Sequence, residues 1–228
     1  MTQIGGVLSL PGAAHAELVG RHFDFVWIDL EHGALGLAEM QEALVGVSAA
    51  GAAAYVRLPA GMRPEPALDA GADGIVFPRV RSLAEARRAV ASLRHAPEGS
   101  RGYGPRRLAV WPRPSRPACV LQVEDLAGVH AAAQIAAVHG VDAVVLGAAD
   151  LSFALGEPLC FDTPPLLSAV ASVRAGCEET GTAFGIAGLP VDEAVHAGAE
   201  IVLAGVDVRL IDCAMAATVQ MAREALHG

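Results

Sequence analysis

Aromatic residues make up only 4% of this 228-residue sequence. No stretch approaches the roughly 18 uninterrupted apolar residues that a membrane-spanning helix needs. The first residues also lack the basic start and long apolar run of a secretory signal peptide. Basic character is scarce as well, because the net charge is −9, whereas phosphate backbones attract positively charged surfaces. We therefore expect a cytoplasmic protein that binds neither membranes nor nucleic acid.

Cysteine is equally sparse. The four cysteines lie far apart and form no CxxC pair: Cys119, Cys160, Cys177 and Cys213. This spacing argues against a disulfide framework or a zinc knot and predicts free thiols. The first apolar run is not followed by GxGxxG, which argues against a dinucleotide-binding fold.

Hydrophobic residues make up 53% of the sequence and fall into short apolar runs that alternate with amphipathic segments. We expect strands at 4–10, 25–30, 53–57, 74–78, 118–124, 142–147, 183–187 and 200–205. The clearest helices are expected at 37–49, 82–94, 125–139, 165–180 and 207–226. Strict alternation of eight strands with helices predicts a single α/β domain over residues 1–228, a (β/α)8 or TIM barrel.

Polar side chains fall where the predicted strands end, which in such barrels is where the chemistry lies. The residues at these ends are Asp29, Glu31, His32, Arg57, Gln122, Glu124, Ala149 and Asp150. Because the carboxyl ends of all strands meet at one mouth of a barrel, the sequence predicts a site there.

Taken singly, most of these residues also have a structural explanation. Asp150 could cap a short helix, and His32 could be an ordinary loop histidine. Glu124 is different, because a carboxylate facing a barrel interior needs a partner or a metal. Two carboxylates from neighbouring strands without a His or Cys cluster suit a hard cation such as Mg²⁺ or Mn²⁺. Arg57 supplies a permanent positive charge for an anionic oxygen, and no predicted strand ends in a lysine that could form a Schiff base.

Six motifs in order resemble those of the HpcH/HpaI aldolase family, the class II pyruvate aldolases, over almost the whole sequence. They are FDFVWIDLEHG, YVRLP with Arg57, LDAGADGIVFPRV, GSRGYG, QVED with Gln122 and Glu124, and GAADLS with Asp150. The resemblance implies a metal-dependent carbon–carbon lyase that cleaves or forms 4-hydroxy-2-oxo acids through a pyruvate enolate, with an aldehyde or other carbonyl compound as acceptor.

The resemblance also implies roles for individual residues. Glu124 and Asp150 would hold the divalent metal (Mg²⁺ or Mn²⁺, with Co²⁺, Ni²⁺ or Zn²⁺ as alternatives), beside Gln122. Backbone amides near Ala149 and Asp150 would meet the substrate carboxylate, and Arg57 would stabilise the enolate oxygen. His32, assisted by Asp29, or a metal-bound hydroxide would move the proton. Asp69 would be contributed across a subunit interface in a dimer-based oligomer or hexamer, in which the last helix is swapped between neighbours.

The sequence departs from the family pattern in two places, of which the first is a small change and the second concerns the acceptor. Ala148 replaces a proline, and the segment 101–117 is short and basic, with Trp111 and five arginines: Arg101, Arg106, Arg107, Arg113 and Arg116. Such a rim predicts an anionic acceptor, or is simply a solvated loop. A citrate-synthase-like or citramalyl-type enzyme, with an oxaloacetate or acyl-thioester partner, is therefore an alternative. A barrel that binds a metabolite without catalysis is a third, against which the retained Glu124, Asp150 and Arg57 count.

Overall fold

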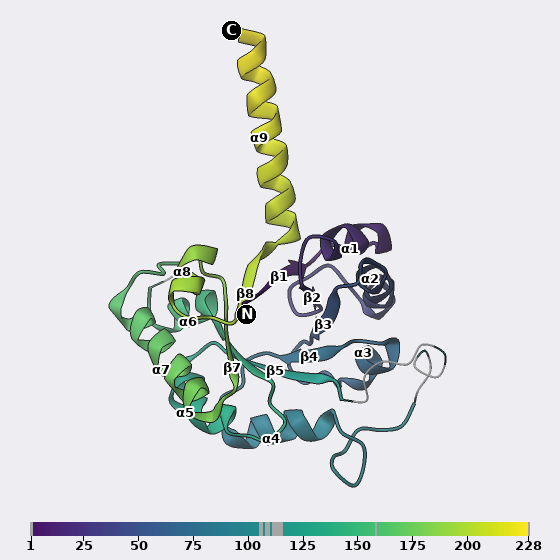
Figure 1. Ribbon diagram of the computed structural model, residues 1–228, viewed down its shortest axis with the longest axis vertical. Coiled ribbons are helices and arrows are strands. Elements are labelled where there is room, and N and C mark those ends of the chain that lie inside the picture. Colours follow the sequence, from purple (N-terminus) through teal and green to yellow (C-terminus); the bar gives the residue numbers. More distant parts are fainter. Residues whose placement is uncertain (1, 105–106, 108–109, 111–115, 158, 228) are drawn as a thin grey trace.

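In the part of the chain that the structure describes, eight parallel strands close into a barrel in chain order, with β8 returning to pair with β1 (Figure 1). The computed structural model describes residues 2–104, 107, 110, 116–157 and 159–227. The strands are β1 (Gln3–Leu8), β2 (Phe25–Asp29), β3 (Ala53–Arg57), β4 (Gly74–Phe77), β5 (Ala118–Val123), β6 (Ala143–Gly147), β7 (Ala183–Ala187) and β8 (Ile201–Val206). The predicted TIM barrel is confirmed, and all eight predicted strands are present.

Helices follow the strands and surround them. They are α1 (Ala13–Gly20), α2 (Leu37–Ala50), α3 (Glu65–Ala70), α4 (Leu83–Ser92), α5 (Leu126–Ala136), α6 (Ala148–Ala154), α7 (Pro164–Thr180), α8 (Val191–His196) and α9 (Asp207–His227). The first strand ends two residues earlier than the sequence predicts. The reason is that the backbone amides of Ser9 and Leu10 donate to the carboxylate of Asp207 instead of continuing the ladder.

A repeated acidic residue stabilises the amino-terminal end of the barrel. It stands just before each even-numbered strand, and its carboxylate accepts a hydrogen bond from a backbone amide of the preceding odd-numbered strand. The pairs are Asp24 with Ile4, Asp73 with Ala54, Asp142 with Cys119 and Glu200 with Phe184. These contacts satisfy amides that would otherwise lack partners at the strand starts. The acidic residue in the repeated Gly–acid–strand pattern is therefore structural, and the chemistry lies at the opposite end.

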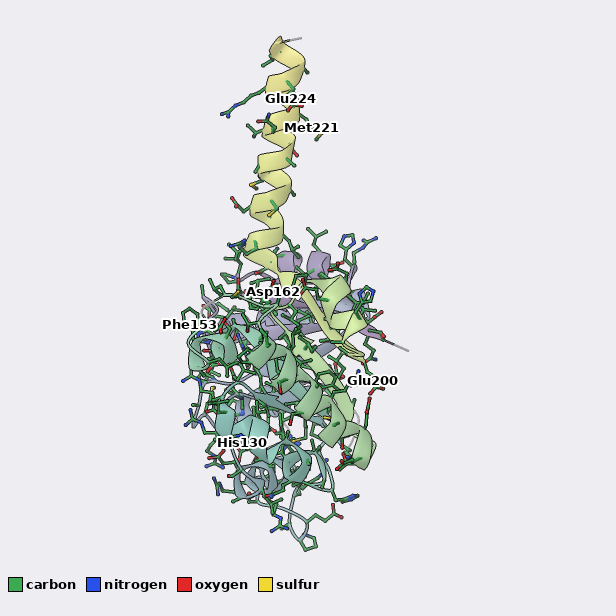
Figure 2. The ribbon with its side chains drawn as sticks, turned by 90° about the vertical axis from the view of Figure 1, so that its left-hand side faces the viewer. His130, Phe153, Asp162, Glu200, Met221 and Glu224 are labelled. Carbon is green, nitrogen blue, oxygen red and sulfur yellow. The ribbon has the colours of Figure 1, made fainter. Side chains whose placement is uncertain are left out.

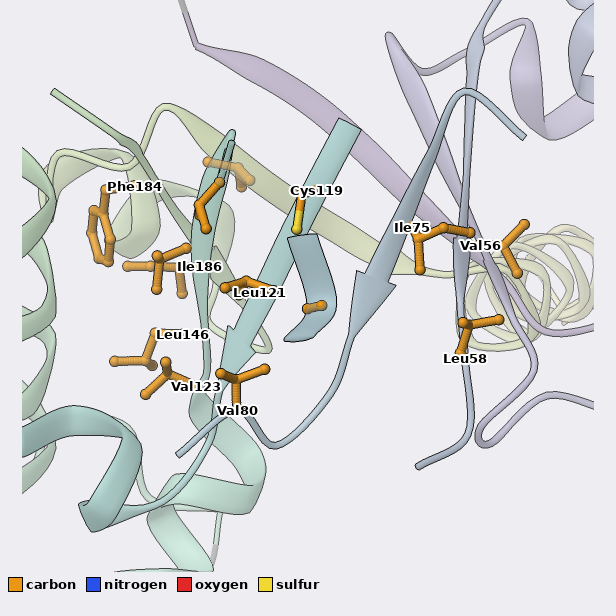
Figure 3. Packing of buried hydrophobic residues seen from close by; sticks show 14 of the residues in the cluster. Val56, Leu58, Ile75, Val80, Cys119, Leu121, Val123, Leu146, Phe184 and Ile186 are labelled. Atoms are coloured by element: carbon orange, nitrogen blue, oxygen red, sulfur yellow. The ribbon is translucent and has the colours of Figure 1, made fainter. Parts of the chain in front are cut away.

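The hydrophobic core has two layers. The outer layer packs strands against helices, and Figure 3 shows part of it, from Val56 and Ile75 to Leu121 and Ile186. The inner layer fills the barrel, with Trp27 and the contacting rings of Phe25 and Tyr55 at its centre. These side chains occupy the barrel interior and leave only a small cavity of about 150 Å³ beside Phe25, Trp27 and Tyr55.

The last helix, α9, stands away from the barrel along most of its length (Figure 1). Met221 and Glu224 lie far out on it (Figure 2), and its large apolar side chains are exposed, including Val208, Met215, Val219 and Leu226. In the described part of the chain, no helix combines the length and apolar character required to cross a lipid bilayer. All four cysteines are free thiols, as the sequence predicts.

Candidate active site

A cavity of about 660 Å³ opens at the carboxyl ends of the strands. Six of the residues that the sequence assigns to the site line it together: Asp29, His32, Arg57, Gln122, Ala149 and Asp150. Glu124 is buried against this cavity, with 5% of its surface exposed. The expected convergence of polar groups at one mouth of the barrel is therefore present.

Asp29 and Arg57 form the most extensive ion pair of this site. They are register partners at the ends of β2 and β3, and Arg57 Nε and Nη2 donate to the two oxygens of Asp29 at 2.9 and 2.6 Å. Burial alone would raise the pKa of Asp29, but the hydrogen bonds and charge of Arg57 hold it below its usual value. Burial alone would likewise lower the pKa of Arg57, yet Asp29 raises it. The guanidinium is thus a fixed positive group in the cavity wall.

Glu124 and Asp150 lie close enough for their charges to interact. Burial raises the pKa of Glu124 from 4.5 to about 7, and Asp150 and Glu31 add to the shift, while a hydrogen bond from the Arg79 amide opposes it. The alternative explanation of Asp150, that it caps a short helix, is wrong. The N-cap residue of α6 is Gly147, and Asp150 lies inside the helix. Two neighbouring carboxylates, one of them buried, make this corner of the site strongly attractive to a cation.

Gly147, at the end of β6, leaves the space that these groups occupy. A Cβ atom at this position would lie 2.8 Å from Gln122 Nε2 and 3.3 Å from Glu124 Oε2. A side chain here would therefore push into the space beside Glu124. Glycine at the strand end thus keeps the carboxylate accessible from the cavity.

Two residues without an assigned role also contribute to this site: Glu31, which the sequence places at the mouth of the barrel, and Arg79, which it does not place there. Glu31 has an 8% exposed side chain, and its Oε2 atom has no hydrogen-bond partner among the described residues. Arg79, which follows β4, adopts a left-handed backbone conformation (φ 55°), and its guanidinium lies 3.8 Å from Glu31 Oε1. Their only signal in the sequence is their place immediately after a strand.

His32 projects from the loop after β2, with 55% of its side chain exposed. Its Nε2 atom lies 3.7 Å from Glu31 Oε2, whereas Asp29 accepts a hydrogen bond from the backbone amide of His32. Asp29 therefore positions the loop that carries His32, and the nearest carboxylate to the ring is Glu31. The exposed ring can exchange protons with solvent and with a molecule in the cavity.

The backbone at Ala149 faces the cavity beside Gly188. Gly188 has φ +94°, and even a Cβ atom there would lie 3.5 Å from the Ala149 nitrogen. The amides of Ala149 and Asp150 lie in the first turn of α6, where the helix itself offers no acceptor. This part of the wall can thus donate hydrogen bonds to a carboxylate.

Asp69 and the described arginines of segment 101–117 lie outside the cavity of their own subunit. Arg101 Nη2 donates to Asp69 Oδ1 at 3.0 Å, and Arg107 donates to the carbonyl oxygen of Ala70. Arg116 binds Asp142 at the opposite end of the barrel. Arg106, Trp111 and Arg113 lie outside the described residues.

The donor set fits a hard divalent cation. No cluster of three or more His, Cys, Asp or Glu side chains with metal-binding geometry occurs within the described residues, so a closed all-protein site is absent there. The pair Glu124 and Asp150, with a Glu31 oxygen nearby that accepts no hydrogen bond from the described residues, instead matches an ion that keeps part of its water shell, as Mg²⁺ does.

The fold and the cavity together are those of a TIM-barrel enzyme with its polar groups at the carboxyl ends of the strands. The chain belongs to the HpcH/HpaI aldolase/citrate lyase family, whose model matches residues 9–213. It is a carbon–carbon lyase of the aldolase class, as the sequence predicts.

Individual relatives support this assignment. The chain is 32% identical to a hydroxypyruvate/pyruvate aldolase of Rhizorhabdus wittichii, covering 80% of this chain and 78% of the relative. It is 31% identical to a 4-hydroxy-4-methyl-2-oxoglutarate aldolase of Chaetomium globosum, covering 76% and 70%. Among solved structures, the citrate synthase SbnG matches with a TM-score of 0.89 at 26% identity, covering 100% of this chain and 95% of that one. A family protein from Burkholderia cenocepacia matches with a TM-score of 0.89 at 29% identity, covering 97% and 95%.

Proposed function

We propose that the protein is a divalent-metal-dependent aldolase that cleaves or forms 4-hydroxy-2-oxo acids, with pyruvate or a close relative as the enolate component. The observation that carries this proposal is the joint presence, around one cavity, of the Glu124–Asp150 pair and the fixed guanidinium of Arg57. The names of the aldolase relatives agree with it.

In the cleavage direction, the hydroxyl proton at C4 is removed, the C3–C4 bond breaks to release an aldehyde, and C3 of the resulting enolate takes up a proton. We assign the proton transfers to His32, whose exposed ring lines the cavity. Arg57 stabilises the negative oxygen of the enolate, a role that suits a permanently charged, fixed donor. The amide of Ala149 binds the substrate carboxylate, and Gln122 lines the space between Arg57 and Glu124.

Glu124 and Asp150 would hold the metal, Mg²⁺ or Mn²⁺ by preference, with Co²⁺, Ni²⁺ and Zn²⁺ as alternatives. When bound, such an ion acts as a Lewis acid toward carbonyl and carboxylate oxygens. The other common route to an enolate from a 2-oxo acid is a Schiff base with a lysine side chain. This sequence contains no lysine at all, which leaves the metal route.

A second candidate uses the same enolate with another partner, an oxaloacetate or an acyl thioester, as a citrate-synthase-like or citramalyl-type enzyme. The specific observation that favours it is the close structural match to a citrate synthase. A mass-spectrometric screen of 2-oxo acids against aldehydes and acyl thioesters, with Mg²⁺ or Mn²⁺ present, separates the two candidates. If no combination of a 2-oxo acid with an aldehyde gives a product, the aldolase proposal is contradicted.

We also propose that α9 packs on a neighbouring subunit in a dimer-based homo-oligomer, up to a hexamer, by exchange of this helix. Its exposed apolar side chains and its position away from the barrel support this proposal. In such an assembly, Asp69 would lie at a subunit interface, close to the neighbour's cavity. Asp69 is otherwise paired with Arg101.

A further inference from the structure

Among the described residues, two arginines line the active-site cavity, and they differ in their partners. Arg57 is bound to Asp29. Arg209, in the first turn of α9, is exposed and has no hydrogen-bond or ion-pair partner within the described residues. The described part of the cavity rim therefore carries one cation without a counter-charge.

The position of Arg209 is fixed by its own barrel. The neighbouring Asp207 is 3% exposed, and its carboxylate accepts from the Ser9 amide at 3.0 Å and from Ser9 Oγ at 2.5 Å. His15 Nε2 lies 2.8 Å from the same carboxylate. On the other side of the turn, Leu210 packs against Gly205, where an added Cβ would meet it at 3.1 Å. The first turn of α9 thus stays on this cavity wherever the rest of the helix packs.

The two halves of the cavity differ in chemistry. The polar groups described above come from β2, β3, β5 and the start of α6. The wall supplied by β8 and by the segment after β7 is mostly apolar and includes Leu189, Pro190, Leu203 and Val206. An apolar wall that ends in a single free guanidinium matches a molecule with a short aliphatic chain and an anionic end. The guanidinium fork matches a carboxylate in particular.

We propose that Arg209 binds the carboxylate of the acceptor, so that this enzyme prefers a carboxylated aldehyde over a neutral aldehyde of the same length. This inference rests on the proposed aldolase function and extends it to the acceptor. It places the anion-binding group on the first turn of α9, whereas the described arginines of segment 101–117 contact Asp69, Ala70 and Asp142.

The test measures the aldol reaction of pyruvate, with Mg²⁺ present, with each of two aldehydes. Succinate semialdehyde and butanal have the same chain length, but only the first carries a carboxylate. We expect Arg209→Gln to raise the KM for succinate semialdehyde about tenfold, equivalent to ~1.4 kcal/mol, with the KM for butanal unchanged. Arg209→Lys should retain part of the preference, because the charge remains. Arg21→Gln is the matched control. It removes one exposed arginine at the opposite end of the barrel, after α1, and should behave like the parent.

Two further readouts separate this inference from the function on which it rests. Exchange of the pyruvate methyl protons with deuterium reports enolate formation and should be the same in Arg209→Gln and the parent. The unreactive analogue 4-hydroxybutanoate, measured by calorimetry without metal, should bind about tenfold more weakly to Arg209→Gln. If exchange occurs but the parent does not distinguish the two aldehydes, or the variant slows both equally, the role of Arg209 is wrong. If the parent shows no exchange, the aldolase proposal fails and this inference fails with it.

Discussion

Arg57 donates two hydrogen bonds to the carboxylate of Asp29 through Nε and Nη2, and its third nitrogen, Nη1, lies 3.5 Å from Gln122 Oε1. The pair joins the ends of two adjacent strands, so that the guanidinium cannot turn away from the cavity. A group held in this way needs no rearrangement when negative charge develops beside it, which is the condition for strong electrostatic stabilisation.

Arg57→Lys tests this role. Lysine keeps the charge but lacks the planar two-donor geometry, so we expect kcat to fall roughly 10²–10³-fold, the scale for loss of one transition-state donor. Exchange of pyruvate methyl protons, followed by NMR in deuterium oxide, should fall in parallel. If exchange persists while aldol cleavage is lost, Arg57 serves the acceptor and not the enolate.

The second prediction concerns the metal. Excess chelator should abolish turnover, and Glu124→Ala should lose Mn²⁺ binding, measured by electron paramagnetic resonance, while circular dichroism shows a folded barrel. The fold survives because removal of one of two neighbouring carboxylates relieves repulsion in the metal-free protein. Asp162→Ala, an exposed carboxylate in the loop before α7, is a control that should bind Mn²⁺ normally. Full activity in chelator would refute metal dependence.

Much of this architecture can be predicted from the sequence, because the alternation of apolar runs and helices is local. The strand ends follow directly, and with them the list of Asp29, His32, Arg57, Gln122 and Asp150. The acidic residues before the even-numbered strands also appear as a repeated pattern in the sequence. The sequence does not show which backbone amides bind these carboxylates. Each hydrogen bond depends on which strands are neighbours in the closed barrel.

Contacts between distant parts of the chain explain the rest. The place of Arg209 depends on the bond between Asp207 and Ser9, which are 198 residues apart in the chain. The pairing of Arg101 with Asp69 likewise joins two segments whose contact no local pattern indicates. The burial of Glu31 likewise cannot be predicted from the local sequence. It depends on ion pairs with Arg57, at the end of β3, and with Arg79, after β4.

Gly147→Ala provides a gentler perturbation of the metal site. The new methyl group would approach Gln122 Nε2 and Glu124 Oε2, and we expect the flexible Gln122 side chain to move and disturb the carboxylate. Changes to groups that orient a metal ligand typically weaken metal affinity about 10–100-fold, and we expect a loss on that scale in a Mn²⁺ titration. Gly102→Ala is the matched control, since no atom of the described residues lies within 4 Å of its added Cβ. If both variants bind Mn²⁺ with equal affinity, Gly147 is not needed to keep space beside Glu124.

The stability of the metal-free protein should depend on pH through Glu124. Burial raises the pKa of this carboxyl from 4.5 to about 7 in the folded state. Between these pH values the folded protein binds more protons than the unfolded chain, so the free energy of unfolding falls as pH rises through this window and then levels off. Urea unfolding in chelator at several pH values should show this fall, and Glu124→Gln should flatten it. Metal affinity should rise over the same window, because the ion competes with the proton. A parent and variant with the same pH profile would show that Glu124 is not the titrating group.

The exposed apolar face of α9 predicts the assembly state. Met215 and Val219 lie one turn apart on the same side of this helix and are exposed in the single chain. If they pack on a neighbouring subunit, Val219→Asp buries a charge in an apolar contact and should dissociate the oligomer. Gln220→Asp, which adds the same charge at the next, already polar position, is the control and should leave the assembly intact. Light scattering at micromolar concentration reads the mass directly. A monomeric parent would refute the exchange of α9 and would also remove Asp69 from any neighbouring active site. An oligomeric parent with an unaffected Val219→Asp variant would move the interface to another surface of the barrel.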